Sequence, residues 1–327
     1  MAGESLGHKS YLQWAREATW GTAVASTRRG GLIESTPTLQ TGVILDPTLD
    51  NSVSRTAQYQ GRRRVRARIR TRLDYESYGL FWDSLFGTAS FGSLGASTTG
   101  AGPYVHTLTE KSILNSLAIQ AIEGDIPTGK CSVLEGAKFT GVRISGEQGD
   151  GERGLCYCEW DVTAEDYAED QTPTGALTAL TAVPVLTQEA TTQDDGTADT
   201  VKLRSFEITI RNPVEEEGAL GQVQIEEPFR NDFLEIKAVF RKIYKTKTLH
   251  AAARAFTVGS PKLVFGSAAT KRITFDIGTA NIEVYQHPVR GYGVVLQEVT
   301  WNAIKDVTNA SALKMTIENN QASGTMW

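Results

Sequence analysis

The segment GRRRVRARIRTRL, residues 61–73, alternates between arginine and smaller or apolar side chains. Such a two-residue period is typical of a β-strand with one buried face and one exposed face. Alternate residues on a strand lie about 6.6 Å apart, so the arginines would form one continuous basic line. We call this line the arginine row; its members are Arg64, Arg66, Arg68, Arg70 and Arg72.

The same two-residue period recurs along the chain and predicts a mainly β fold. It is clear at 206–210 and 234–240, where apolar side chains alternate with polar or charged ones. Further strands are expected at 117–122, 138–145, 155–163, 263–265, 272–277, 282–285, 294–303 and 313–317.

Two short helices are predicted, and each directly follows an alternating strand. In 74–86, aromatic side chains and leucines recur at spacings of three and four residues before Gly87. Segment 244–256 shows the same spacing with leucine, alanine and phenylalanine before Gly259. A short helix after a long strand is expected to pack on the flank of a β-barrel or sandwich.

The order of these elements indicates an internal repeat. Strand, helix and three further strands follow one another in both halves, and the last strand of each half carries a tryptophan, Trp160 or Trp301. The repeat, in a chain of 327 residues, predicts two tandem β-barrel or sandwich units, each with a short flanking α-helix.

We expect the first unit to span 1–167, with a long hairpin arm and an exposed Gly/Ser/Thr-rich insertion at 88–102. The second unit is expected at 201–327. Between them, 168–200 is rich in Thr, Ala, Asp and Gln and is interpreted as a linker that partly docks.

Composition places the chain among folded proteins, with 40% hydrophobic and 22% charged residues and a net charge of -5. No apolar run approaches the length of a membrane helix, and residues 1–10 lack the apolar core of a secretory signal. We therefore expect a chain made in the cytosol, without membrane insertion. Three cysteines give an odd count, and the spacing of Cys156 and Cys158 does not fit a zinc site.

Motifs that carry catalysis are missing from the sequence. The four histidines are scattered, and no nucleophile elbow, phosphate-binding loop or dinucleotide fingerprint follows a strand. We expect no enzyme activity, no cofactor and no metal site.

The arginine row has three possible roles. It could follow a nucleic-acid backbone, it could be a solvated face, or it could meet acidic segments of a neighbouring subunit. We favour the third role, because a guanidinium and a carboxylate can pair through two hydrogen bonds and fix a register. The acidic partners expected at this inter-subunit interface are Glu215, Glu216, Glu217, Glu226 and Glu227.

Several short motifs carry a family resemblance. The opening WAREATWGTA at 14–23 resembles the Glu-x-x-(Trp/Tyr)-Gly-Thr opener of siphophage tail tube proteins, also called major tail proteins. An extended hairpin region at 32–59, a basic strand leading into DYESY at 74–78, and FEITIRN at 206–212 follow in the family's order. The chain departs from the pattern at Pro213, where the family often has a second Asn, and in its dense arginine row.

The resemblance implies rings that stack into a hollow tube, through which DNA passes during ejection without sequence-specific binding. Two units in one chain would suit a trimeric ring with pseudo-sixfold symmetry, with a hexameric ring as the alternative. The implied partners are further copies, the tape measure protein, the tail terminator and the distal tail protein. The implied location is the virion tail, after assembly in the bacterial host cytoplasm.

The hairpin region 32–59 and its counterpart 215–230 are candidate stacking arms, since exposed edges must be covered by neighbours. A lumen that does not hold phosphates should be neutral or acidic, which would place the arginine row away from it.

Two alternatives to this function stay open. One is another self-assembling phage or secretion component, such as a tail terminator, a capsid decoration protein or a type VI secretion tube subunit. The other is a nucleic-acid-binding module centred on the strand 62–72.

Overall fold

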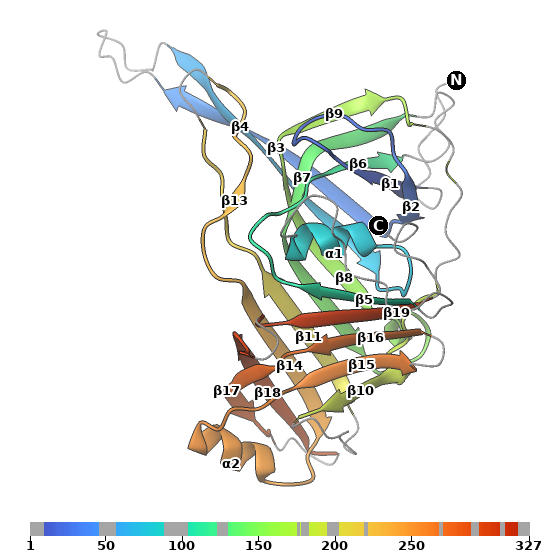
Figure 1. Cartoon of the computed structure of the whole chain (residues 1–327), viewed down its shortest axis with the longest axis vertical. Coiled ribbons are helices and arrows are strands. Elements are labelled where there is room, and N and C mark those ends of the chain that lie inside the picture. The colour runs from blue at the N-terminus through green and yellow to red at the C-terminus, as the bar shows by residue number, and fades with distance from the viewer. Residues whose placement is uncertain are drawn as a thin grey trace.

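The computed structural model describes residues 10–45, 57–87, 104–122, 130–174, 177, 183–194, 203–218, 222–267, 271–288, 294–307 and 311–319. The predicted insertion 88–102 lies outside them. The fold is mainly β, as predicted, and its described sheets stay open and do not close into a barrel (Figure 1). No helix in the described part of the chain has the length and apolar character needed to cross a membrane.

Eight strands form the long central part of the largest sheet, each antiparallel to the next. We call these eight strands the wall. In spatial order they are β3 (Glu34–Leu45), β4 (Gln58–Arg72), β8 (Tyr157–Ala164), β7 (Cys131–Glu147), β11 (Leu203–Arg211), β14 (Glu235–Ile243), β18 (Leu296–Ile304) and β17 (Thr279–Gln286).

Strand β4 shows why the alternating pattern forms a wall strand. Val65 and Ile69 are fully buried, whereas the arginines between them point to the opposite, open face. Among the described strands, the neighbouring strand β3 pairs with β4 alone, and it contains Pro37, which is consistent with an edge position because proline has no backbone N–H to donate.

The remaining strands extend the wall at one end and cover one of its faces. The first half of β7 continues into β6 (Leu117–Ile122), β1 (Tyr11–Arg16) and β2 (Arg28–Gly31), and it also pairs with β9 (Asp166–Gln171). The second sheet has the order β10 (Ala190–Gln193), β15 (Lys262–Ser267), β16 (Lys271–Asp276), β19 (Lys314–Asn319) and β5 (Tyr104–Thr109). A two-stranded ladder joins β12 (Val214–Glu215) to β13 (Phe229–Arg230).

The two halves of the sequence interlock. Wall strands β7 and β11 pair across the halves, and the second sheet takes β5 from the first half and β10 from the expected linker range. Aromatic packing also joins the layers, with the rings of Phe206 and Phe265 5.3 Å apart. The division of the chain into units at 1–167 and 201–327 stays a prediction.

Both predicted helices exist, but α1 begins five residues and α2 four residues later than expected. Helix α1 spans Gly79–Phe86 and α2 spans Thr248–Ala255. The Asp74 side chain accepts hydrogen bonds from the backbone N–H groups of Glu76 and Ser77, at 2.9 and 2.6 Å, and holds this segment as a turn. The end of α1 before Gly87, which has a φ of +80°, agrees with the prediction.

The wall contains the same arrangement twice. The order β3-β4-β8-β7 is matched by β11-β14-β18-β17, with α1 packed on β7 and α2 on β17. Trp160 lies opposite Ile69, and Trp301 lies opposite Ala238. Helix α1 begins ten residues after Ile69, and α2 begins ten residues after Ala238. The repeated order therefore has a residue-level correspondence between the two halves.

Candidate assembly surface

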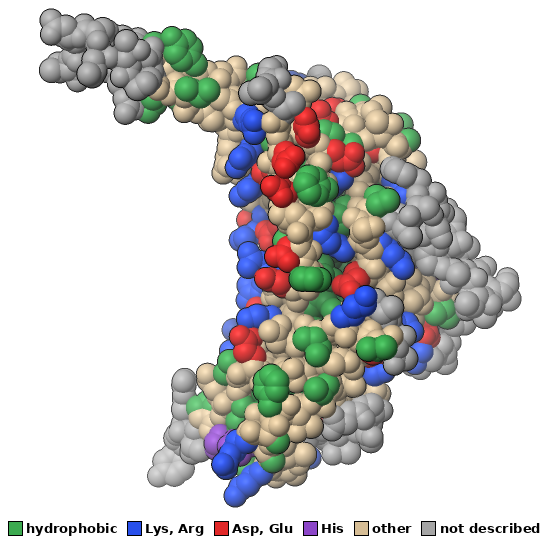
Figure 2. Space-filling view, turned by 60° about the vertical axis from the view of Figure 1, so that its left-hand side comes forward, with side chains coloured by type: hydrophobic (Ala, Val, Ile, Leu, Met, Phe, Trp, Pro, Cys, Tyr) green, Lys and Arg blue, Asp and Glu red, His purple; other side chains and the backbone are tan. Residues whose placement is uncertain are grey.

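The open face of the wall carries charges of both signs on neighbouring strands. Glu159 on β8 lies between Arg70 on β4, at 3.9 Å, and Arg143 on β7, at 3.7 Å. Arg143 continues the line to Glu207 on β11, at 2.7 Å, and this carboxylate raises the pKa of the guanidinium. Figure 2 shows Lys and Arg side chains along the hollowed edge of the molecule, with acidic side chains beside them.

A segment between β11 and β14 crosses the basic part of this face. We call it the strap; its described residues are 212–218 and 222–234. The Glu216 carboxylate accepts a hydrogen bond from the Thr163 hydroxyl at 2.8 Å and lies 3.7 Å from Arg64 and 3.4 Å from Arg66. The strap runs beside the projecting end of the β3–β4 hairpin (Figure 1). One carboxylate therefore compensates two members of the arginine row.

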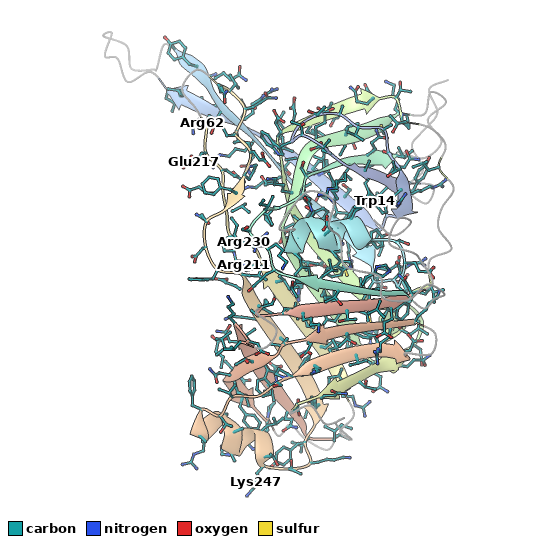
Figure 3. All side chains as sticks on the ribbon, viewed as in Figure 1. Trp14, Arg62, Arg211, Glu217, Arg230 and Lys247 are labelled. Carbon is teal, nitrogen blue, oxygen red and sulfur yellow. The ribbon has the colours of Figure 1, made fainter. Side chains whose placement is uncertain are left out.

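Two hydrogen bonds to strap carbonyls, one from the Arg62 guanidinium and one from the Arg63 backbone, hold the strap along β4. Arg62 donates to the carbonyl of Gly218 at 2.6 Å, and the Arg63 N–H donates to the carbonyl of Val223 at 2.8 Å. Figure 3 shows Arg62 and Glu217 close together at this level. These contacts stabilise the strap against the wall. Because both acceptors are backbone carbonyls, they do not depend on which side chains the strap carries at these positions.

A buried lysine fixes the descending part of the strap. Lys138, with a nearly inaccessible side chain, donates to Glu227 at 2.7 Å and to the carbonyl of Pro228 at 2.8 Å. Burial lowers the pKa of Lys138, and the Glu227 carboxylate opposes that shift. Removing Glu227 would leave a buried charge with fewer partners.

Arg230 anchors the base of the strap to the first half of the chain. Its guanidinium donates to Asn212 at 2.5 Å and to the carbonyls of Lys111, Leu85 and Phe86. The last two carbonyls belong to the C-terminal end of α1, where carbonyls lack partners within the helix and favour a cation. Burial lowers the pKa of Arg230.

The structure places every predicted interface residue. In the arginine row, Arg68 lies 3.3 Å from Asp161, and Arg72 is in register with Tyr157 at the end of β4. On the acidic side, Glu215 accepts from Asn231 at 3.1 Å, and the Glu217 carbonyl accepts from the N–H of Glu226. The row and the strap thus meet within one chain, and their contact with a neighbouring chain stays a prediction.

Sequence reasoning missed the partners Asp161, Glu159, Thr163 and Lys138. Three of these residues lie on outward positions of predicted strands, so their chemistry was visible, but the strand order that brings them to the arginine row was not. A buried lysine such as Lys138 has no sequence signal beyond an ordinary polar position.

Two further surfaces of the molecule expose apolar side chains. The first lies on the arm, which we define as the described residues 39–45 and 57–62 of the β3–β4 hairpin. Apolar side chains gather there next to the grey tip in Figure 2. Its exposed apolar residues are Leu39, Val43, Ile44, Leu45 and Tyr59.

The second apolar surface lies at the base of the strap and the end of β18. Phe233 is 88% exposed, Ile304 is 47% exposed and Val307 is 94% exposed. Phe233 and Ile304 line one hollow of about 540 Å³. We call these three residues the apolar seat. Exposed apolar side chains that form a contiguous patch are candidates for contact with another molecule.

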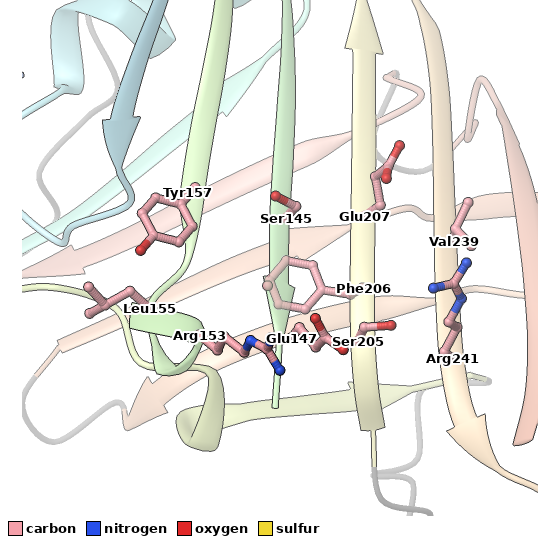
Figure 4. A pocket seen from close by; sticks show the side chains of 11 residues that line it. Ser145, Glu147, Arg153, Leu155, Tyr157, Ser205, Phe206, Glu207, Val239 and Arg241 are labelled. Atoms are coloured by element: carbon pink, nitrogen blue, oxygen red, sulfur yellow. The ribbon is translucent and has the colours of Figure 1, made fainter. Parts of the chain in front are cut away.

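The open face also bears a hollow of about 300 Å³ over β7, β11 and β14 (Figure 4). Its lining includes Glu207 and Arg241, which belong to the charge pattern of the face, and it has neither histidine nor cysteine. The cysteines are buried elsewhere, and burial raises the pKa of Cys156 to about 12, which disfavours the reactive thiolate. Among the described residues, no cluster of potential metal ligands is found.

An open β wall with a mixed-charge face, and an arm that carries exposed apolar side chains, are features of a structural protein that contacts other chains. Residues 7–303 match the family model for phage tail tube proteins, so the chain belongs to the phage tail tube protein family. This is a structural family, and membership implies a component of the virion tail that assembles into a multisubunit tube. No curated protein matches the chain.

Proposed function

We propose that the chain is the tail tube subunit of a long-tailed phage of the siphophage type. It assembles with copies of itself into rings that stack into a hollow tube, and DNA leaves through the lumen without sequence-specific binding. The observation that carries the proposal is the wall, whose two end strands, β3 and β17, each have one edge without a partner strand among the described residues. An exposed strand edge offers unpaired backbone N–H and C=O groups with which a strand of another chain can pair.

The junction inside the chain provides a template for the junction between chains. Strands β7 and β11 join the two repeats in an antiparallel register from Glu147 opposite Ser205 to Gly141 opposite Arg211. The repeat makes β17 the counterpart of β7 and β3 the counterpart of β11. Strand β17 would therefore pair with β3 of the next copy. Pro37 on β3 has no backbone N–H, so this pairing would lack at most one hydrogen-bond donor.

The unequal burial of the two helices supports this arrangement. Every residue of α1 is buried, whereas α2, its counterpart, has no buried residue. Helix α2 lies at the β17 end of the chain, and Phe256 at its C-terminus is 70% exposed. A neighbour placed against β17 would cover α2 as the second sheet covers α1. Three such chains give a trimeric ring with pseudo-sixfold symmetry.

The open face of the wall is our candidate for the lumen wall. Free guanidiniums would hold phosphates, which was the reason for expecting the arginine row away from the lumen. Carboxylates of the same chain lie 3.3 to 3.9 Å from Arg64, Arg66, Arg68 and Arg70. This compensation leaves a face of mixed charge that can pass DNA without retaining it. The other face is packed in the core.

In this function the tube ends meet the tail terminator and the distal tail protein, and the lumen holds the tape measure protein before ejection. Assembly takes place in the bacterial host cytoplasm. The protein needs no cofactor and performs no catalysis in this role.

Electron microscopy of the purified protein tests the proposal. Long hollow tubes or stacked rings are expected, with three chains per ring in end-on class averages. Isolated oligomers that decorate a capsid shell, or a protein that stays monomeric at high concentration, would contradict the function. Six chains per ring would contradict the trimer while leaving the tube function intact.

A further inference from the structure

The correspondence between the two repeats assigns a counterpart to each residue that seats the strap. The pairs Ile69 with Ala238 on the central strands, and Trp160 with Trp301 on the adjacent strands, fix the alignment. By this alignment β4 corresponds to β14, and β8 corresponds to β18. The strap, which follows β11, corresponds to the arm, which follows β3.

In the first repeat, the strap lies on basic and polar residues, which we call the seat of the strap. Arg64, Thr163 and Asp166 contact strap residues: Arg64 and Thr163 meet Glu216, and Asp166 accepts from Gln224 at 3.4 Å. The Glu216 side chain is only 9% exposed, so the acidic strap fits closely on this seat.

In the second repeat, the counterpart positions are apolar. The alignment takes Arg64 to Phe233, Thr163 to Ile304 and Asp166 to Val307. These are the three residues of the apolar seat, and they are exposed although the corresponding residues of the first repeat have strap partners. The chain therefore carries a second seat, which is apolar where the seat of the strap is polar. No segment of the described chain crosses this second seat as the strap crosses the seat in the first repeat.

The arm has the chemistry that this second seat requires. The strap offers carboxylates to a basic seat, and the arm offers Val43, Ile44 and Leu45, whose side chains are about half exposed. An apolar arm on an apolar seat buries surface on both sides, which is the main favourable term in association. The arm projects away from its own body (Figure 1) and cannot reach the far end of its own wall.

We propose that the arm of one copy lies on the apolar seat, Phe233, Ile304 and Val307, of the next copy in the ring. The contact repeats between chains the crossing that the strap makes within a chain. It rests on the proposed tube function and names the residues that join neighbouring subunits. Asp232 and Lys305, which line the same hollow, form a polar rim around the apolar contact.

The different chemistry of the two seats also prevents exchange between them. A strap carboxylate placed on the apolar seat would lose its partners, and the apolar arm placed on the arginine row would desolvate guanidiniums without compensation. Each segment therefore has one favourable place, and the ring closes with a defined neighbour.

Cysteine cross-linking in the assembled protein tests the contact. A chain with Ile44→Cys and Phe233→Cys is expected to form disulfide-linked dimers and trimers under mild oxidation, since Cys131, Cys156 and Cys158 are buried and do not compete. The matched control pairs Ile44→Cys with Val183→Cys, another exposed apolar position outside the seat. Equal cross-linking in both proteins would overturn the proposal.

A charge test gives a second readout. Phe233→Glu and Ile44→Lys are each expected to raise the protein concentration needed for assembly about tenfold or more, and the double variant is expected to recover much of that loss. Both positions are exposed, so thermal unfolding of the monomer should be unchanged. If the wild-type protein forms tubes, but the cysteine variant does not cross-link and the double charge variant does not recover assembly, the arm contact alone is refuted. Absence of wild-type rings and tubes would instead refute the tube function.

Discussion

Replacing Glu216 is expected to release the strap from the arginine row. Its carboxylate accepts one hydrogen bond from Thr163 at 2.8 Å and lies near Arg64 and Arg66, which are about half exposed. A hydrogen bond to a charged group contributes about 1.5–3 kcal/mol, and each exposed ion pair about 0.2–1 kcal/mol. Glu216→Gln keeps an acceptor for Thr163 and loses the ion pairs, so about 0.5–1.5 kcal/mol is expected. Glu216→Ala loses both, about 2–4 kcal/mol.

Hydrogen exchange can measure this loss locally. The N–H of Arg63 donates to Val223, and the N–H of Glu226 donates to Glu217, so both amides report opening of the strap. Since 1.4 kcal/mol is about a factor of ten, Glu216→Gln should speed exchange at these amides a few-fold, and Glu216→Ala about thirtyfold or more.

The matched control is Glu235→Gln, which removes an exposed carboxylate 3.9 Å from Arg211 on the same face. It should leave exchange at Arg63 and Glu226 unchanged. Unchanged exchange in Glu216→Ala would refute the reasoning, because it would show that the strap is held by its backbone contacts alone.

Three further predictions concern assembly, the core and pH. Arg66→Glu with Arg68→Glu places like charges beside Glu216 and Asp161, which should detach the strap from the wall, so ring or tube assembly should fail in electron micrographs, and normal tubes would contradict the need for a seated strap in assembly. Phe81→Ala removes a buried ring centred 4.6 Å from that of Phe139 and should lower the free energy of unfolding by about 3–5 kcal/mol in urea titrations, with a loss below 1 kcal/mol arguing against a tightly packed site. Burial raises the pKa of Asp83 from 3.8 to about 6, with Arg16 and Asn115 opposing the shift, so the contribution of Asp83 to the free energy of unfolding should fall as pH rises from about 4 to about 6, by about 2–3 kcal/mol. Asp83→Asn should remove that part of the pH dependence, and an identical pH profile would contradict the assignment.

Local patterns predicted the strands and the ends of the helices because those features depend on near neighbours in sequence. The alternation of β4 and the stop of α1 at Gly87 are examples. The predicted start of α1 was wrong by five residues, because the Asp74 side chain competes for N–H groups that a helix would leave open. Strand β5 was not predicted, since its partner β19 lies about two hundred residues away.

The candidate site divides in the same way. Its charged residues could be recognised from composition and spacing, and the predicted acidic segment does contain Glu216, which meets the arginine row. The placement of that contact within one chain depends on the path of the strap, which no local pattern encodes. The apolar seat could not be recognised either, because Phe233 and Ile304 become neighbours only through the pairing of β14 with β18.

The two repeats use different chemistry because their contacts face different entropic demands. The strap is tethered at both ends to the wall it crosses, so its contact loses little translational freedom, and a few partly exposed ion pairs with one hydrogen bond are enough. The arm must capture a separate molecule, and association carries an estimated penalty of about 4–15 kcal/mol. Apolar burial by Val43, Ile44 and Phe233 can supply the larger free energy that this step needs. The strap crosses the first repeat within one chain, whereas the proposed arm contact on the second repeat joins two chains. This difference explains why the first repeat carries an arginine row and the second an apolar seat.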